Sequence, residues 1–577
     1  MRFLVRLFAV IGFLFVLLAG GAVALVWRHL DADEPLGERV VLTLDLEAPL
    51  AEGPPADPLS AVLSGRRGNL QDAIAALDRA GRDPRVKGVL ARVGDDAHGM
   101  AATQELRDAV KRFRATGRFA LAHAETFGEL AENNIGYYLA TAFDEIWLQP
   151  VGVVGLTGLA AEVPFARRAL DRWSIQPQIT KRAEYKTAFD SATESGFTPA
   201  HREMLESLVG NLAGQLVAGI AEGRKLEPAV VQGLLDRGPF TGTEAKAERL
   251  VDGFASYDEA ERQARDRAGG TAELVELEDY AGRAADDTPE DAPLIAVVTG
   301  SGPIQRGDAE GLFDEGGVMS GEAVARAIDD AAARAPKAIV FRVDSPGGSA
   351  VASETIRQAV LRAKARRIPV VVSMGNVAGS GGYWVAMDAD RIVAQPGTLT
   401  GSIGVIAGKV ATAGLWGELG VDWGRVAAGA QAGMNSAITP FDEREWARLN
   451  ALVDDTYRGF VERVAKGRNL PPERVEQIAR GRVWTGAQAQ EIKLVDALGG
   501  FETALRQAKA LAGLPEDGRV RLAHYPEPDR ALAFFADLVG DEVEAGVSSR
   551  LAARLLPLLT GQSAEGPAAM PATGRLR

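Results

Sequence analysis

The chain repeats itself once, and this duplication constrains the fold more than any other feature of the sequence. Residues 86–93 (VKGVLARV) match 336–343 (PKAIVFRV) at an offset of 250 positions. Further blocks follow in the same order at offsets near 246: 136–140 with 382–386, 146–150 with 392–396, 240–242 with 484–486, and 250–252 with 494–496. Several blocks in one order predict two copies of one domain, at 38–270 and 292–515.

Segments outside the two copies have different characters. The linker 284–291 is acidic and contains Pro289, and the tail 516–577 is apolar only in patches. Within the tail, charges interrupt 531–559, which favours amphipathic helices, and the Ser, Gly, Pro and Ala residues after about 560 are typical of disorder. A length of 577 residues fits two such domains with cores of their own.

Each copy alternates short apolar runs with helical periods, which predicts an α/β fold. In the second copy we expect strands at 294–298, 338–343, 368–373 and 391–394, and helices at 321–333, 351–366 and 381–388. A longer helix is expected at 442–466, packed on the outside. Strands separated by helices indicate βαβ units and a mainly parallel sheet.

The N-terminal residues 7–27 are an uncharged, proline-free run that would span about 31 Å as a helix, enough for a bilayer core. Arg2 and Arg6 precede the run, and acidic residues follow Arg28. This charge bias predicts a membrane anchor at 1–30 with the N-terminus inside and the rest of the chain outside. The alternative is a cleaved signal peptide, whose apolar region is usually shorter.

Composition excludes several classes of chemistry. The chain has 64 Lys and Arg against 78 Asp and Glu, a net charge of −14, which disfavours a nucleic-acid partner. It has no cysteine, so disulfides, thiolate nucleophiles and Cys-ligated metals are absent. Five scattered histidines form no metal-ligand motif, and we expect neither a metal nor another cofactor.

Two glycine clusters in the second copy indicate where chemistry could occur. One is 344–349 (DSPGGS) and the other is 379–384 (GSGGYW); each follows a strand and opens a helix. Ser380 would sit at a helix N-terminus, where the Gly381 N–H and a glycine N–H of the first cluster could stabilise an oxyanion. Ordinary turn chemistry is the alternative, because Gly-Ser-Gly-Gly is common in loops.

The first copy lacks both glycine clusters. Asn134 faces Ser380, and 96–98 (DAH) faces the Pro-Gly-Gly position. A turn that the fold needs should survive in both copies, so a cluster present in one copy indicates function.

A serine nucleophile needs a base, and no histidine is placed like that of a catalytic triad: His98, His123, His201 and His524. A lysine made neutral by burial is the other option. Lys186, in 184–189 (EYKTAF), has aromatic neighbours, and its counterpart falls near Met434. A serine in one copy and a lysine in the other suggest a composite site, although a solvated lysine remains the alternative.

These motifs resemble those of the signal peptide peptidase A (protease IV) family, in its long two-repeat bacterial form. The motifs are 344–348, 378–384, 398–405 (TLTGSIGV) and 185–188 (YKTA), and the resemblance covers the anchor to about residue 515. One departure is Gly379, where alanine is frequent in the family.

The resemblance implies two tandem Clp protease/crotonase-like (ββα-superhelix) domains and an N-terminal transmembrane helix. It implies a Ser–Lys dyad of Ser380 and Lys186, with Ser402 orienting the lysine. With it we expect Gly381 and Gly348 to form the oxyanion hole. It also implies a homotetramer in the bacterial inner membrane, with a cytoplasmic N-terminus and a periplasmic catalytic part, that degrades cleaved signal peptides and other extended apolar peptides.

Two other functions remain open from the sequence. A crotonase-type acyl-CoA enzyme would use paired backbone amides on a thioester enolate and would not need Ser380. A catalytically inactive membrane-anchored scaffold would bind peptides without hydrolysing them.

Overall fold

The computed structural model describes residues 36–53, 68–94, 98–129, 131–284, 288–307 and 317–526. The expected membrane segment at 7–27 and the amphipathic helices at 531–559 lie outside these ranges.

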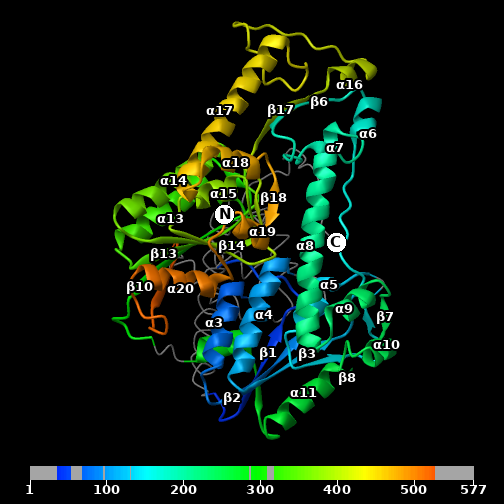
Figure 1. Cartoon of the computed structure of the whole chain (residues 1–577), viewed down its shortest axis with the longest axis vertical. Coiled ribbons are helices and arrows are strands. Elements are labelled where there is room, and N and C mark those ends of the chain that lie inside the picture. The colour runs from blue at the N-terminus through cyan, green and yellow to red at the C-terminus, as the bar shows by residue number, and fades with distance from the viewer. Residues whose placement is uncertain are drawn as a thin grey trace, which may run out of the picture.

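Two sheets form the centre of the molecule, and each contains six parallel strands in the same order (Figure 1). The first runs β8 (Gly253–Phe254), β4 (Glu145–Leu148), β3 (Phe119–Ala124), β2 (Val86–Arg92), β1 (Val40–Asp45), β9 (Glu273–Glu276). The second runs β19 (Ala497–Leu498), β15 (Arg391–Ala394), β14 (Val370–Gly379), β13 (Ala338–Ser345), β10 (Leu294–Ser301), β20 (Arg521–Tyr525). The second sheet also contains β16 (Leu399–Gly401), beside β14, and β18 (Val483–Thr485), which pairs antiparallel with β16. The predicted α/β class and the tandem duplication are confirmed.

Helices cover both sheets. In the first repeat they are α3 (Leu70–Ala80), α4 (Met100–Ala115), α5 (Asn134–Ala140), α8 (Pro199–Arg224), α9 (Pro228–Leu235), α10 (Gly242–Ala247), α11 (Tyr257–Arg267) and α12 (Leu277–Arg283). In the second they are α13 (Gly321–Ala333), α14 (Ala350–Ala365), α15 (Gly381–Ala386), α17 (Glu443–Arg468), α18 (Pro472–Ile478), α19 (Gly486–Glu491) and α20 (Phe501–Leu511). Short strands β5 (Val153–Val154), β7 (Phe240–Thr241), β11 (Ile304–Gln305), β12 (Met319–Ser320), β16 (Leu399–Gly401) and β18 (Val483–Thr485) complete the repeats.

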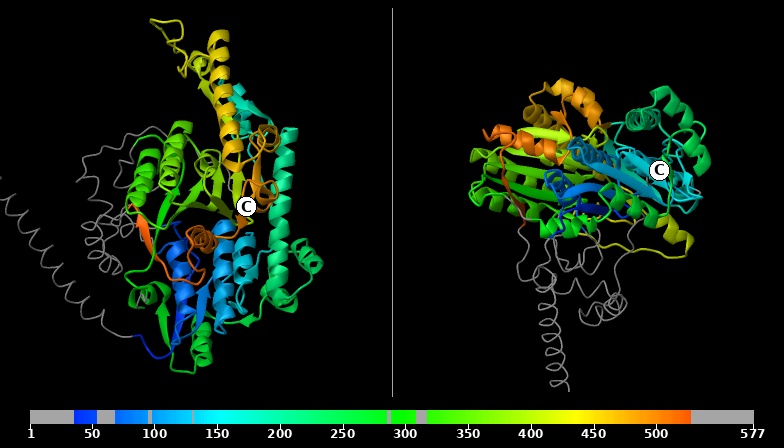
Figure 2. Two further views of the ribbon diagram at one scale, coloured as in Figure 1. Left: turned by 60° about the vertical axis from the view of Figure 1, so that its left-hand side comes forward. Right: turned by 90° about the horizontal axis from the view of Figure 1, so that it is seen from below.

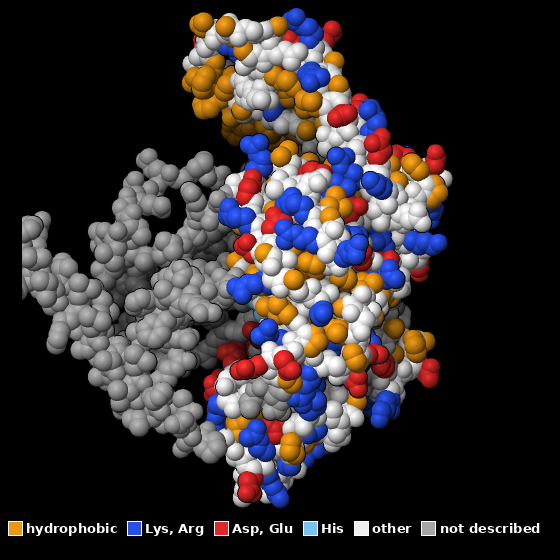
Figure 3. All heavy atoms as spheres, turned by 90° about the vertical axis from the view of Figure 1, so that its left-hand side faces the viewer, with side chains coloured by type: hydrophobic (Ala, Val, Ile, Leu, Met, Phe, Trp, Pro, Cys, Tyr) orange, Lys and Arg blue, Asp and Glu red, His pale blue; other side chains and the backbone are white. Residues whose placement is uncertain are grey.

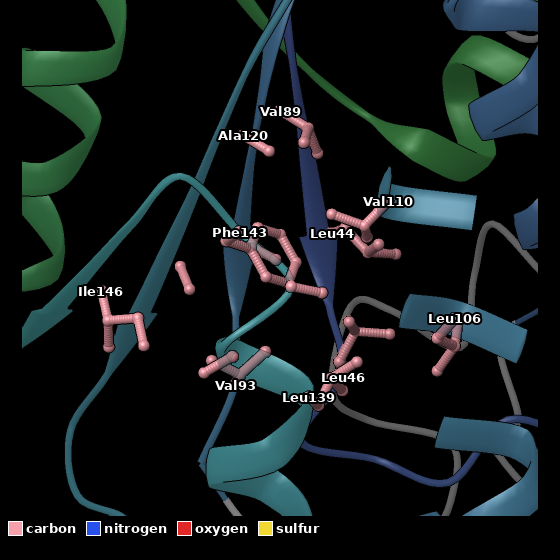
Figure 4. Packing of buried hydrophobic residues seen from close by; sticks show 14 of the residues in the cluster. Leu44, Leu46, Val89, Val93, Leu106, Val110, Ala120, Leu139, Phe143 and Ile146 are labelled. Atoms are coloured by element: carbon pink, nitrogen blue, oxygen red, sulfur yellow. The ribbon is translucent and has the colours of Figure 1, made fainter. Parts of the chain in front are cut away.

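Burial of the central strands on both faces explains their continuous apolar runs. In the first repeat, Leu44 of β1, Val89 of β2 and Val110 of α4 lie around Phe143 (Figure 4). Equivalent hydrogen bonds recur in both repeats. The Tyr137 hydroxyl donates to Leu250 O at 2.7 Å. In the second repeat the Tyr383 hydroxyl donates to Leu494 O at 3.0 Å.

Each sheet extends beyond the repeat boundary expected from the sequence. β9 pairs with β1, and β20 pairs with β10, so both edge strands follow the expected ends at 270 and 515. These strands come after the last block that the two copies visibly share, which is why sequence comparison ends short of them.

β14 is longer than the expected strand 368–373 because it pairs with two partners in succession. Residues 371–374 pair with β15, and residues 377–379 pair with β16. The second half of β14 therefore ends directly before Ser380, which is the residue before α15.

A projecting arm rises from the two sheets (Figures 1 and 2). We define the arm as α6 (Arg167–Arg172), β6 (Gln176–Arg182), α7 (Asp190–Thr193), β17 (Val405–Ala411), α16 (Ala413–Glu418) and residues 419–442. β6 of the first repeat pairs antiparallel with β17 of the second along seven positions. Hydrophobic side chains gather at the upper end of the molecule in Figure 3, and the arm exposes Leu419, Trp423 and Val426.

The two repeats meet along α4. The fully buried Arg342 guanidinium of β13 contacts Glu105 of α4 at 2.6 Å and Glu52 at 2.7 Å. Gly99, the residue before α4, has no capping side chain, and Asn376 of β14 supplies the cap by accepting from the N–H groups of Ala101 and Ala102 at 3.1 Å. Side chains of the second repeat therefore complete a helix of the first.

Within the described residues, α8 is the one helix long and apolar enough to cross a membrane by length and composition. Its most apolar window is 44% buried in the protein, and its neighbours are β18 and α9. These contacts are those of a helix packed in a folded domain.

Candidate active site

Ser380 lies at the tight turn between β14 and α15. Its backbone has φ 55° and ψ −115°, a conformation that is strained for any residue with a side chain. Pairing of Gly379 with Gly401 and a 2.9 Å bond from Ser380 N–H to Gly401 O hold the turn. Backbone strain of this kind collects at functional sites, where it aims a side chain that a relaxed turn would not.

Two glycine amides flank the serine. A Cβ built on Gly381 would lie 3.1 Å from the Gly348 nitrogen, so the two backbones touch. Gly348 has φ 155° and lies against Ile304, where a Cβ would come within 2.2 Å of the Ile304 carbonyl oxygen. Neither amide donates to another described residue. Two neighbouring amides without a described acceptor are groups that could donate to a developing oxyanion.

Lys186 reaches Ser380 from the other repeat. Its Nζ lies 3.0 Å from Ser380 Oγ, 2.9 Å from Ser402 Oγ and 2.9 Å from Ser402 O. The side chain is only 5% exposed. The structure thus brings together Ser380, Lys186 and Ser402, which the sequence analysis selected from three separate segments.

Burial lowers the pKa of Lys186 to about 8 from its ordinary value of 10.5. Desolvation is the sole cause, and no carboxylate opposes it. A substantial share of the amine is therefore neutral near pH 8, where it has a lone pair to accept a proton.

Ser402 is matched to both forms of the amine. A protonated lysine has three N–H donors, for which the two Ser402 oxygens and Ser380 Oγ are acceptors. A neutral lysine has two donors and one lone pair, so the Ser402 oxygens can hold the donors while the lone pair faces the Ser380 hydroxyl.

A segment of the second repeat fixes the loop that carries Lys186. The N–H groups of Ala183 and Tyr185 donate to Arg480 O at 3.3 and 3.2 Å. Gly481 follows, with φ 82°, and a Cβ there would lie 2.5 Å from Lys186 N. Only a glycine lets the two backbones approach this closely.

The Arg482 side chain completes this contact between the repeats. Its guanidinium lies over the Tyr185 ring at 5.0 Å and pairs with Glu203 at 2.8 Å. The role of residues 480–482 cannot be predicted from the sequence, because nothing in that segment indicates a partner about 300 positions earlier.

The histidines lie elsewhere. Among the described residues, His123 bonds to Ala255 O, His201 contacts Asp190, and neither these two nor His98 or His524 bonds to the Ser380–Lys186 pair. No group of three or more metal-ligand side chains occurs in the described ranges.

The equivalent site in the first repeat is occupied by structural hydrogen bonds. The Asn134 side chain accepts from the N–H groups of Thr157 and Gly158 at 3.0 and 2.9 Å and donates to Gly158 O. The Asn134 side chain therefore holds the loop at Thr157 and Gly158, and an amide is not a nucleophile.

A family model described as peptidase family S49 matches residues 128–270 and 362–515, slightly more than half of the chain. The two matched regions lie one in each repeat. The second contains Ser380 and Ser402, and the first contains Lys186.

Several other proteins have sequences similar to this chain. Protease 4 of Salmonella typhi is 30% identical over 522 residues, covering 86% of this chain and 81% of the relative. A putative signal peptide peptidase SppA of Enterococcus faecium is 38% identical over 176 residues, covering 30% of this chain and 51% of the relative. Among solved structures, a mutant of the 1510-N membrane-bound stomatin-specific protease is 15% identical, with 40% of this chain and 97% of that chain covered and a TM-score of 0.26.

Proposed function

The chain belongs to peptidase family S49 and is a serine peptidase, and from this premise we propose that it is a membrane-anchored endopeptidase with a Ser380–Lys186 dyad. The observation that carries the proposal is the 3.0 Å separation of Lys186 Nζ from Ser380 Oγ in a buried site without a histidine.

The first chemical step is acylation. Neutral Lys186 takes the proton of Ser380 as Oγ attacks the scissile carbonyl carbon. The carbonyl oxygen becomes an oxyanion, which the N–H groups of Gly381 and Gly348 stabilise. Loss of one such donor typically costs about 10²–10³ in rate. Protonated Lys186 then gives its proton to the leaving amine, and an acyl-enzyme remains.

The second step is hydrolysis of the acyl-enzyme. Lys186 takes a proton from water, and the resulting hydroxide attacks the ester carbonyl. Collapse of the intermediate breaks the bond to Ser380 Oγ, which regains its proton from Lys186. In this proposal Ser402 orients the amine in both steps, which is supported by the 2.9 Å distances from Nζ to its two oxygens.

Signal peptides left by preprotein processing, and other extended apolar peptides, are the substrates that we propose. The resemblance to signal peptide peptidases supports this class, as does the expected anchor at 7–27, which would hold the site beside a membrane. With such an anchor in the bacterial inner membrane, the charge bias supports a cytoplasmic N-terminus and a periplasmic catalytic part as part of this proposal. A homotetramer belongs to the same proposal.

The test uses the full chain in detergent with a fluorophosphonate probe and a fluorogenic apolar peptide. Wild type should react with the probe and cleave the peptide, whereas Ser380→Ala and Lys186→Met should do neither. Lys466→Met is the matched control, because Lys466 is an exposed lysine of α17.

Cleavage by both dyad variants at the wild-type rate would overturn the dyad. A wild type that is inert toward unfolded and signal-like peptides would favour the scaffold. Turnover of an acyl-CoA by Ser380→Ala would favour the crotonase-type enzyme.

A further inference from the structure

β14 changes its register against β13 near its end. Val343 pairs with Met374 and Ser345 pairs with Ala378, so one residue of β13 stands opposite three residues of β14. We call residues 375–377 the β14 bulge. A bulge bends its strand and redirects the side chains that follow, and bulges are common beside active sites. Here the bent strand is the one that leads to the nucleophile.

Asp344 is the residue of β13 that stands opposite the β14 bulge, and its side chain binds the bulge. Its Oδ1 accepts from the Val377 N–H at 2.7 Å. A Cβ on Gly375 would lie 2.9 Å from Asp344 Cβ, so the aspartate packs closely against the bulge backbone. The Thr398 hydroxyl donates to Gly375 O at 2.8 Å. Side chains thus bind backbone groups that have no partner on β13 in the described register.

The first repeat has no carboxylate at the position of Asp344. Residues 86–93 match 336–343 at an offset of 250, and the next residue is Gly94 in the first repeat and Asp344 in the second. A buried strand forms in both repeats, so the fold of a repeat does not need the carboxylate. The group occurs only in the copy that has the nucleophile, which indicates a role at the site.

The surroundings of Asp344 are unfavourable for a carboxylate. Burial raises its pKa, and the nearby charge of Glu52 raises that pKa further. The hydrogen bond from Val377 and the charge of Arg342 act in the opposite direction, but Arg342 already pairs with Glu52 and Glu105. A buried acid in such a place costs stability, and it commonly has a role that an apolar residue could not fill.

The chain on both sides of this contact leads to the active site. After Asp344, the Ser345 hydroxyl oxygen accepts from the Gly347 N–H at 3.1 Å, and a Cβ on Gly347 would lie 2.8 Å from Ser380 Cβ. Gly348, one of the two amides beside the serine, comes next. On the other strand, the β14 bulge ends three residues before the serine. A shift of the bulge relative to β13 would therefore move the nucleophile relative to the amides.

The β14 bulge also binds the first repeat. Asn376 Oδ1 accepts from the N–H groups of Ala101 and Ala102 at the start of α4. The approach is close, since a Cβ on Gly99 would lie 2.5 Å from Asn376 Cγ. The first repeat is the one that supplies Lys186, so the bulge connects the segment that carries the serine with the repeat that carries its base.

We infer that Asp344 is a positioning residue of the peptidase: its carboxylate holds the β14 bulge and thereby aligns Ser380 with Lys186 and with the two glycine amides. Through Asn376, the same bulge couples this alignment to the docking of the repeat that supplies the lysine. The inference rests on the dyad proposed above and adds to it a residue that does not touch the substrate.

Kinetics counted per active site test the inference on the full chain in detergent. The end point of fluorophosphonate labelling after prolonged incubation counts the folded sites, and peptide turnover divided by that number gives kcat per site. Asp344→Ala removes the acceptor, so kcat per site should fall about 10²-fold at a nearly unchanged KM. Asp344→Asn keeps an acceptor oxygen for the Val377 N–H, so kcat per site should return to within about tenfold of wild type.

Asp390→Ala is the matched control. The Asp390 carboxylate also accepts from an amide of β14, the Val370 N–H at 2.8 Å, but at the opposite end of the strand. This variant should keep wild-type kcat per site even where fewer sites are folded. A merely structural role of Asp344 predicts the same pattern for Asp344→Ala: fewer labelled sites and an unchanged kcat per site.

Wild-type kcat per site in Asp344→Ala would therefore overturn the inference. An equal loss in Asp344→Asn would also overturn it, because the charge rather than the hydrogen bond would then matter. An equal loss in Asp390→Ala would overturn it as well, because any weakened end of β14 would then have the same effect. A wild type that cleaves no peptide would instead overturn the dyad proposal.

A second pair of variants tests the other side of the β14 bulge. Asn376→Ala removes the acceptor for the α4 amides, and kcat per site should fall roughly tenfold, since only part of the displacement reaches Ser380. Asn376→Asp keeps an acceptor oxygen at the helix N-terminus and should restore kcat per site. Wild-type kcat per site in Asn376→Ala would contradict the inference whether or not Asp344→Ala folds.

Discussion

Lys186 Nζ lies 3.0 Å from Ser380 Oγ, although the two residues are 194 positions apart and belong to different repeats. Neither repeat contains both groups. Between them, β6 pairs with β17, and the Arg480 carbonyl accepts two backbone hydrogen bonds from the loop that carries Lys186. Folding of both repeats and their docking are therefore preconditions for the site.

Peptide cleavage should depend on pH through Lys186. Because burial lowers the pKa of Lys186 to about 8, we expect kcat/KM to fall about tenfold per pH unit below 8 and to level off above it. Initial rates between pH 5.5 and 9.5 measure this profile. An acid limb near 6 would instead point to Asp344, whose pKa burial raises to about 6, and would contradict Lys186 as the titrating base.

Lys186→Met should stabilise the folded protein at neutral pH. The wild-type amine carries a proton in both states below about pH 8, and burying that charge costs up to roughly 3 kcal/mol. Between 8 and 10.5 the unfolded amine stays protonated while the folded amine does not, so wild-type stability rises with pH relative to the variant. The advantage of Lys186→Met should therefore be largest below pH 8 and vanish above 10.5. Denaturation midpoints of both proteins across this range provide the measurement, and a pH-independent difference would contradict it.

Ser402→Gly should reduce kcat and leave KM nearly unchanged. The Oγ that holds Lys186 Nζ is lost, while Ser402 O remains and glycine tolerates the φ of 49° at this position. We expect a loss of about 10- to 100-fold, since a misaligned base costs on the order of 10²-fold. Steady-state kinetics with a fluorogenic peptide separate the two constants. A raised KM at full kcat would assign Ser402 to substrate binding.

Gly481→Ala should impair catalysis although it replaces neither residue of the dyad. The added Cβ would lie within 2.7 Å of Lys186 N, Cα and Cβ, so the lysine must move. A displacement of this size should cost about 10²-fold in kcat. Gly233→Ala is the matched control, because nothing lies within 4 Å of a Cβ there. Equal rates for the two variants would show that the Lys186 loop tolerates displacement.

Arg342→Met should destabilise the junction between the repeats. It leaves Glu105 and Glu52 without the guanidinium that neutralises them, and breaking a buried pair typically costs about 3–5 kcal/mol. Arg92 is the equivalent residue of the first repeat, with partially exposed partners at 3.7 and 3.9 Å, and Arg92→Met should cost under about 1 kcal/mol. Thermal unfolding followed by circular dichroism compares the two. Similar melting temperatures would show that the junction does not depend on Arg342.

Much of the fold could be predicted because its cause is local. A few residues are enough to recognise the apolar run of β10 and the helical period of α13. The observed bounds of α13 are those that the pattern predicts. The second half of β14 was missed, since pairing with β16 decides it rather than apolar periodicity. β20 was missed because its place in the sheet depends on β10, more than 200 positions earlier.

The residue types of the site could also be predicted from the sequence. Glycines around Ser380 and Gly348 indicate tight turns, and comparison of the repeats shows that one copy has the serine and the other has the lysine. These facts favour a serine nucleophile with a base from elsewhere, although the sequence leaves a crotonase-type enzyme and an inactive scaffold open.

Distance and solvation required the tertiary structure. The 3.0 Å contact between Lys186 and Ser380 depends on backbone bonds to Arg480 and on the missing side chain of Gly481, which no local pattern links to Lys186. The lowered pKa of Lys186 depends on burial by both repeats at once. Sequence alone determined which chemical groups the chain has for a site, because the order of residues fixes its side chains. Only the docking of two folded repeats decided that these groups meet in a site poor in water, because proximity and desolvation are properties of the assembled chain.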